Sequence, residues 1–183
     1  MGAQIAVVGG SGAAKEALVA AEAVGAELAR NGAVLVCGGL DGVMAAACRG
    51  AKSAGGLTVG ILPDTDPDAA NPWVDVVIPT GLGEARNALV VRSVGALVAV
   101  DGEYGTLSEI ALALRAGTPV VGLRTWSLVR PDGTVDPGIE VADDPPTAAV
   151  RALERAADAA GRSQATGRAR SSARSSRRRP GAR

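Results

Sequence analysis

An arginine and a glutamate on either side of one strand-and-turn segment could act together on a phosphorylated ligand. Arg86 leads a helical run, residues 96–100 form an apolar strand, and the glycine turn Gly102–Thr106 opens the next helix, with Glu109 further on. Backbone N–H groups at a helix N-terminus attract anions. We therefore predict that Arg86 and Glu109 are catalytic candidates beside a turn that binds phosphate.

Each of these two side chains also has a purely structural interpretation. Thr106 and Glu109 have the spacing of a capping box, in which the threonine caps the helix and the glutamate reaches back. Arg86 is the only cation between Asn71 and Val91, so it could be a solvated helix-end arginine paired with Glu84. Both interpretations stay open at the level of the sequence.

Two further glycine clusters follow predicted strands. One is Gly9-Gly10-Ser11-Gly12 and the other spans residues 38–44. Three such turns at the C-terminal ends of parallel strands predict a ligand site at the switch point of the sheet. The alternative is close packing of helices through small residues, with Met44 in the core. The residues expected to bind the ligand or its phosphate are Gly10, Ser11, Gly39, Gly42, Met44, Asn87, Gly102, Gly105 and Thr106, and no metal ligand is expected.

The familiar nucleotide-binding motifs are incomplete. The first turn has Lys15 where a dinucleotide fingerprint needs its third glycine, and the second strand ends in Cys37-Gly38-Gly39 without an acid for the ribose. The chain also lacks a Walker sequence. These departures disfavour an NAD site and ATP hydrolysis of the P-loop type.

Short apolar segments alternate with helical patterns along the chain. This alternation predicts an α/β, Rossmann-like fold, doubly wound, with a mainly parallel sheet and helices on both faces. A turn at 130–133 is expected between two edge segments. The expected strands are 5–8, 33–37, 58–62, 74–78, 96–100 and 119–123, and the expected helices are 14–31, 42–54, 82–93, 106–116 and 146–159.

The composition excludes several kinds of chemistry. The chain has no histidine, which rules out a His general base, a Ser-His-Asp triad and a His-ligated metal. Cys37 and Cys48 fit neither a zinc nor a redox spacing, so we expect small buried residues in a reducing cytosol. No signal peptide or membrane-spanning run is evident, which predicts a cytoplasmic protein with no membrane partner.

Charge divides the chain into two parts. Residues 162–183 hold eight arginines and no acid, so the remainder carries 11 basic groups (19 minus 8) against 19 acidic ones. We expect one domain over residues 1–160 and a basic, disordered tail over residues 161–183. Nucleic-acid binding by this tail is a weaker expectation, because arginine runs without aromatic residues are usually solvated.

The ordered set of motifs resembles the LONELY GUY (LOG) phosphoribohydrolases, a family long misannotated as lysine decarboxylases. The segments that carry the resemblance are VVGGSG, LVCGGLDGVMAAACRGA, GGLTVGILP, the helix-leading Arg86 and GEYGTLSEIALAL, within residues 5–123. NPWVDVVIPTGLGEARN followed by GTLSEIALAL looks closest to the molybdenum-cofactor carrier branch of that superfamily. The resemblance implies a nucleotide or pterin ligand and a homo-oligomer, a dimer or larger.

In the LOG enzymes an arginine and the glutamate that closes P-G-G-x-G-T-x-x-E are the catalytic pair, and Arg86 and Glu109 match them. The resemblance then implies hydrolysis of a nucleoside 5′-monophosphate to free base and ribose 5-phosphate, with no cofactor required. A carboxylate can stabilise an oxocarbenium-like state or activate water, and an arginine can orient substrate or leaving group. The alternative function is a non-catalytic carrier of the molybdenum cofactor (molybdopterin), or a sensor of a nucleotide-like ligand.

The chain departs from the LOG pattern at two places near this pair. Asn87 stands where those enzymes usually have lysine, so one cation is missing. Asp101-Gly102-Glu103 replaces their Pro-Gly-Gly, and a carboxylate about 4 Å from a phosphate would cost on the order of 4 kcal/mol at an effective dielectric near 20. Either Glu103 points away from the pocket, or the ligand is not a simple monophosphate.

Overall fold

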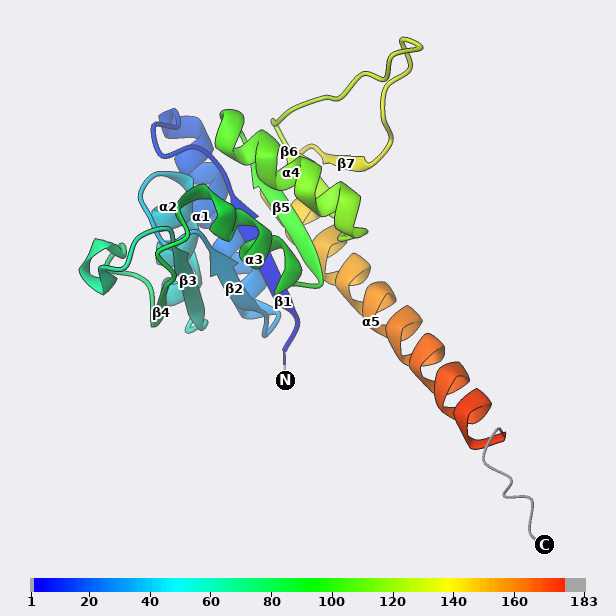
Figure 1. Ribbon diagram of the computed structural model, residues 1–183. Coiled ribbons are helices and arrows are strands. Elements are labelled where there is room, and N and C mark those ends of the chain that lie inside the picture. Colours follow the sequence, from blue (N-terminus) through cyan, green and yellow to red (C-terminus); the bar gives the residue numbers. More distant parts are fainter. Residues whose placement is uncertain (1, 177–183) are drawn as a thin grey trace, which may run out of the picture.

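The computed structural model describes the backbone of residues 2–176 and the side chains of residues 2–162. At its centre is a seven-stranded, all-parallel sheet in the order β4-β3-β2-β1-β5-β6-β7 (Figure 1). The predicted α/β, Rossmann-like fold is therefore confirmed. The strands are β1 (Gln4–Val8), β2 (Val34–Cys37), β3 (Thr58–Leu62), β4 (Val76–Pro79), β5 (Ala96–Val100), β6 (Val120–Leu123) and β7 (Ile139–Ala142).

Helices cover both faces of the sheet (Figure 1). One face carries α1 (Lys15–Arg30), α2 (Val43–Ser53) and α5 (Pro145–Ser176), and the other carries α3 (Asn87–Arg92) and α4 (Tyr104–Ala116). Two short 3-10 turns, η1 (Pro67–Ala69) and η2 (Gly83–Arg86), lie before β4 and α3. Because β1 pairs with both β2 and β5, the chain changes direction across the sheet between these strands. Loops that leave the C-terminal ends of β1 and β5 therefore diverge and leave a crevice.

Small side chains let the helices approach one another closely. The core is built from Ala, Val, Leu and Ile, with Val24 and Leu28 of α1 fully buried on one side of the sheet and Val90 and Ile110 on the other. A Cβ atom at Gly25 of α1 would collide with the backbone of Ala47 in α2. The glycine thus sets the distance between α1 and α2, which begin after the glycine turns that follow β1 and β2.

Helix boundaries differ from the sequence expectation at the site. The segment expected to be one helix from Leu82 divides into η2 and α3, and the helix expected to start at Thr106 begins two residues earlier, at Tyr104. The N-cap of α4 is Glu103, and no side chain caps it. The capping box is therefore wrong: Thr106 is the third helical residue, and Glu109 lies too far along the helix to reach the cap.

Two features near the C-terminus were not predicted in full. The edge strand β7 follows the turn at 130–133, where Val129 and Val135 pair in an antiparallel bridge. The last helix continues to Ser176, through part of the segment expected to be disordered. Its Ala, Arg and Gln content favours a helix, and no proline follows until Pro180. Residues 177–183 of the expected tail lie outside the described residues.

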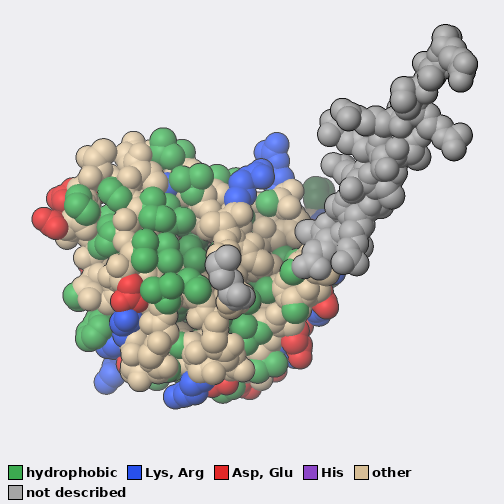
Figure 2. Space-filling model, turned by 90° about the horizontal axis from the view of Figure 1, so that it is seen from below, with side chains coloured by type: hydrophobic (Ala, Val, Ile, Leu, Met, Phe, Trp, Pro, Cys, Tyr) green, Lys and Arg blue, Asp and Glu red, His purple; other side chains and the backbone are tan. Residues whose placement is uncertain are grey.

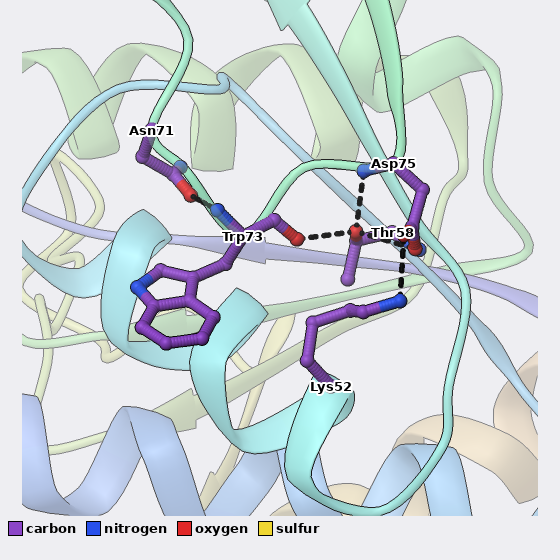
Figure 3. A network of polar contacts seen from close by, with 5 residues as sticks. All are labelled: Lys52, Thr58, Asn71, Trp73 and Asp75. Carbon is purple, nitrogen blue, oxygen red and sulfur yellow. Dashed lines mark hydrogen bonds and ion pairs between the residues drawn. The ribbon is translucent and has the colours of Figure 1, made fainter.

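A polar network fixes the connection between β3 and β4 (Figure 3). The Thr58 hydroxyl, fully buried, donates to the Trp73 carbonyl (2.7 Å) and accepts from the Asp75 N–H (2.9 Å). The Asp75 carboxylate accepts from the Thr58 N–H and from Lys52 of α2 (2.9 and 2.6 Å). This carboxylate also keeps its pKa below the usual range, because these hydrogen bonds outweigh its desolvation. The loop that contains Asn71 is thereby held against the sheet.

Hydrophobic side chains also reach the surface on the edge strand β4 and on α3. Val76 and Ile78 of β4 are 44% and 42% exposed, and Leu89 of α3 is 42% exposed. Figure 2 shows hydrophobic side chains gathered over the half of the molecule that holds β2 to β4, with charged side chains toward its rim. Among the helices of the described chain, none combines the length and apolar character needed to cross a bilayer.

The close approach of α1 and α2 can be tested by adding one methyl group. We expect Gly25→Ala to lower the free energy of unfolding by about 1–3 kcal/mol, because the two helices must separate. Gly161→Ala is the matched control: it also lies within a helix, but nothing lies within 4 Å of its Cβ position. Urea unfolding of both variants measures the difference, and equal stabilities would contradict the close helix contact.

Candidate ligand-binding site

A cleft of about 390 Å³ opens at the C-terminal ends of β1 and β5. Residues 9–12 after β1 form one wall, and residues 103–106, 108 and 109 at the start of α4 form another. Residues 84, 86 and 87 and the apolar side chains of Leu40, Met44 and Pro63 complete it. The cleft therefore lies at the switch point that the glycine turns predicted.

Arg86 is buried in this cleft and is not a solvated helix-end residue. Only 7% of it is exposed, and its Nη1 lies 3.6 Å from Oε1 of Glu109. The guanidinium covers Gly38, where a Cβ atom would occupy the place of its nitrogens. The structure therefore pairs Arg86 with Glu109, as predicted. Among the described side chains, Arg86 forms no ion pair with Glu84, the alternative partner.

The guanidinium has hydrogen-bonding capacity that the protein does not use. Nε and Nη1 of Arg86 are the only buried side-chain nitrogen or oxygen atoms without a hydrogen-bond partner among residues 2–162. The 3.6 Å contact to Glu109 is longer than a normal hydrogen bond. An unsatisfied buried donor is costly, and most of all when it is charged. The guanidinium thus keeps N–H donors that the described side chains leave without an acceptor.

Glu109 shares the burial of Arg86. Desolvation raises the pKa of the Glu109 carboxyl to about 7, although the charge of Arg86 acts in the opposite direction. The carboxyl is therefore present in both protonation states near neutral pH. A carboxyl group with this pKa can act as a proton donor or acceptor in catalysis.

The N-terminus of α4 offers further donors to the cleft. Leu107 is the first residue whose N–H bonds back into the helix, to the Glu103 carbonyl at 3.0 Å. The N–H groups of Gly105 and Thr106 precede it and remain unpaired by the helix. These donors, with the helix dipole, favour an anion at this wall of the cleft.

Eight of the predicted site residues meet around this cleft. Asn87, 8% exposed at the start of α3, contributes a neutral amide where a second cation was missing. Met44 both lines the cleft and packs in the core, so its two interpretations are compatible. The residues brought together are Gly10, Ser11, Met44, Arg86, Asn87, Gly105, Thr106 and Glu109.

Three predicted glycines shape the turns without lining the cleft. Gly42 has a φ of +68°, and a Cβ there would collide with the carbonyls of Gly10 and Ser11. Gly39 has a φ of +78°, and a Cβ there would come within 2.5 Å of the Leu62 side chain. Gly102, at a φ of +115°, lies against the Thr106 side chain. Their conformations explain why glycine is needed, independently of any ligand.

Asn71 supports the second turn, and sequence reasoning missed it. Its side-chain amide donates to the carbonyls of Gly39 (3.1 Å) and Leu40 (3.0 Å), while Figure 3 shows its oxygen accepting from the Trp73 N–H. The Cys37 thiol accepts from the Gly39 N–H at 3.3 Å and lies 3.5 Å from the Cys48 sulfur. Both thiols are buried, as expected. No local motif in the sequence marks this role of Asn71, because the two carbonyls that its amide binds are more than 30 residues away.

Glu103 does not point away from the cleft. Its Cγ lies 3.9 Å from the position a Cβ would take at Gly10, and its Oε1 lies 3.9 Å from the equivalent position at Gly12. The exposed carboxylate thus lies beside the first glycine turn, on the cleft itself.

An aromatic pair stands at the rim beside Glu103. Tyr104 lines the cleft, is 81% exposed, and packs against Trp126 with ring centroids 5.9 Å apart. The Trp126 indole donates to the Glu103 carbonyl (3.3 Å), and the Thr125 hydroxyl donates to the Asp101 carbonyl (2.5 Å). Sequence reasoning missed Tyr104, although a lone tyrosine within a glycine turn was a usable signal.

The chain is similar in sequence and in structure to several known proteins. An uncharacterized protein of Archaeoglobus fulgidus is 47% identical over 121 residues, which cover 66% of this chain and 80% of that protein. The molybdenum cofactor binding protein of Rippkaea orientalis is similar in structure (TM-score 0.75, 33% identity, 84% of this chain and 96% of the other). So is the molybdenum cofactor carrier protein of Chlamydomonas reinhardtii (TM-score 0.74, 39% identity, 85% and 99%).

These likenesses confirm the resemblance to the carrier-like branch of the LOG superfamily. Residues 2–149, which make up most of the chain, match the model of a single protein family. The chain belongs to the SLOG cluster4 family.

Proposed function

We propose that this chain binds the molybdenum cofactor, or a closely related phosphorylated pterin, as cargo in the cleft and releases it unchanged. The observation that carries the proposal is the buried Arg86 guanidinium, whose Nε and Nη1 lack acceptors within the described side chains. An anionic group supplies those acceptors, and the N–H groups of Gly105 and Thr106 lie on the same cleft. The two similar structures are of proteins named for binding or carrying this cofactor.

The residues around the pair favour a carrier over a hydrolase. Asn87 gives the cleft no second cation for a monophosphate. The cleft wall instead has the carboxylates of Glu84, Glu103 and Glu109 against the single charge of Arg86. Such a site holds an anionic group at one place and a ring with hydrogen-bond donors at another. A pterin that carries a phosphate has both parts.

Binding of the cofactor can be measured on purified protein. We expect the wild-type chain to retain molybdopterin and Arg86→Ala to retain less than a tenth of it, because a charged hydrogen bond is worth about 1.5–3 kcal/mol. Fluorescence of the oxidised pterin released from each protein gives the amount bound.

Arg92→Ala is the control for this experiment. Arg92 is an exposed arginine, six residues further along and outside the cleft. Its replacement should leave the bound amount unchanged. A wild-type protein that binds no molybdopterin, or an Arg86→Ala protein that binds as much, would overturn the proposal.

A second function is favoured by one specific observation, the pKa of about 7 for Glu109. In hydrolysis of a nucleoside 5′-monophosphate, a water oxygen forms a bond to C1′ of the ribose while the bond from C1′ to the base nitrogen breaks. The leaving base takes a proton, and the water loses one. Glu109 could accept the proton from water, or stabilise the cationic sugar, and Arg86 could orient the phosphorylated sugar.

Hydrolysis and its pH dependence test this second function. If the reaction occurs, kcat should fall as the pH drops below about 7, because Glu109 must be ionised to accept a proton. Glu109→Gln should lower kcat by about 10²-fold or more. Release of ribose 5-phosphate from AMP and GMP is the assay. Turnover that is absent, or equal in wild type and Glu109→Gln, would exclude the hydrolase.

The ionisation of Glu109 can be read independently of catalysis. Its pKa is raised from 4.5 to about 7 on folding, so the folded state binds the extra proton between these values. The free energy of unfolding should therefore fall by on the order of 3 kcal/mol as the pH rises from 4.5 to 7. Glu109→Gln should remove this slope, and exposed Glu154→Gln should keep it. Equal slopes in urea unfolding of all three proteins would contradict the shift.

Other expectations from the sequence stay predictions. The homo-oligomer would be supported by the exposed apolar side chains of β4 and α3, but its state is open to measurement by light scattering. Nucleic-acid binding by the arginine-rich C-terminus, and a cytoplasmic location, are likewise expectations that binding and localisation experiments address.

A further inference from the structure

Glu103 places an unused pair of acceptors at the rim of the cleft. Within the part of the chain whose side chains are described, its carboxylate has no hydrogen-bond or ion-pair partner. It extends over the Gly10–Gly12 turn, with Oε1 nearest to Gly12. A carboxylate accepts hydrogen bonds and donates none, so it selects a ligand edge that carries donors.

The chemistry of this acceptor pair restricts the ligand. Two carboxylate oxygens bind best to two adjacent N–H donors in one plane, as in the carboxylate pairs of arginine. Among common heterocycles, the 2-amino-4-oxopyrimidine ring presents such an edge: a ring N–H beside an exocyclic amino group, found in both guanine and pterin. Adenine and cytosine present an amino group beside a ring nitrogen with a lone pair, which the carboxylate would repel.

Tyr104 provides a surface for the same ring. The chain has one Tyr, two Trp and no Phe, yet Tyr104 and Trp126 lie together at the rim. Tyr104 is 81% exposed although it lines the cleft, so part of its ring is free to contact a ligand. Trp126 supports the Tyr104 ring and is tied by its indole N–H to the Glu103 backbone. A planar heterocycle can stack on such an aromatic side chain.

The two ends of the cleft then suit the two ends of one ligand. Arg86 and the N–H groups at the start of α4 attract the anionic group, and the Glu103 carboxylate lies against the Gly10–Gly12 turn on the same cleft. A ligand whose ring lies against this turn would bring its N–H donors to the Glu103 carboxylate and its anionic group to Arg86.

We propose that Glu103 is a specificity-determining residue, which selects ligands with a 2-amino-4-oxopyrimidine ring while Tyr104 stacks on that ring. This inference rests on the proposed function, because it assumes that the cleft holds a phosphorylated heterocyclic ligand. It goes further by naming the ring class and the side chains that recognise it.

Binding of GMP and AMP tests the selection, because these two probes share the phosphate and sugar and differ in the ring. We expect isothermal titration to show GMP binding at least about tenfold tighter than AMP to the wild-type protein. Glu103→Gln should reduce that ratio to within about threefold, since the amide replaces one acceptor by a donor. Glu154→Gln, an exposed glutamate outside the cleft, should keep the wild-type ratio.

Variants of Tyr104 separate stacking from a general disturbance. Tyr104→Ala should weaken GMP binding at least about fivefold, and Tyr104→Phe should restore it, because the ring and not the hydroxyl makes the contact. Unchanged binding in Tyr104→Ala would remove stacking from the proposal.

The outcomes distinguish this inference from the function on which it rests. Equal binding of GMP and AMP, or a preference that survives in Glu103→Gln, would overturn the selection while the cleft remains a ligand site. If molybdopterin binds and neither nucleotide does, Glu103→Gln should weaken molybdopterin binding at least about tenfold. Unchanged molybdopterin binding in this variant would overturn the selection. Failure of all three ligands to bind would overturn both proposals.

Discussion

The burial of one charge, the Arg86 guanidinium, is the constraint on which the site depends. A charged group is expensive to remove from water unless it is paired and hydrogen-bonded. Here the pairing is incomplete: Glu109 stands at 3.6 Å and carries a pKa of about 7, so it only partly neutralises the arginine. The fold therefore buries a charge that the described side chains only partly compensate, and the protein bears part of that cost.

Glycine makes this burial geometrically feasible. Gly38 lies under the guanidinium with no room for a Cβ, and Gly42 brings α2 against the first turn. Asn71 and the Thr58–Asp75 network hold the second turn from behind, so the arginine rests on a backbone that is itself fixed. Rigid support of this kind preorganises a site before the ligand arrives.

Much of the fold could be predicted from the sequence because its signals are local. Apolar runs such as Thr58–Leu62 and Ala96–Val100 begin and end in the structure where their patterns indicated. The meeting of Arg86 with Glu109, and of the three glycine turns, could also be predicted, because parallel strands bring their C-terminal ends to one edge of the sheet. Three results could not be foreseen in this way: the start of α4 at Tyr104, the role of Asn71, and the direction of Glu103. Each depends on contacts between segments distant in sequence, which override helix-cap patterns.

The loop between β6 and β7 contacts the cleft through two hydrogen bonds. Thr125 bonds to the carbonyl of Asp101, a non-glycine residue at a φ of +52°, and Trp126 bonds to that of Glu103. Most of this loop extends away from the sheet (Figure 1). Its outer residues can therefore change in length and sequence without disturbing the core, whereas a shift at its base is transmitted to the turn that opens α4. Changes in this loop would thus reshape one wall of the cleft while the packing of the sheet stays the same.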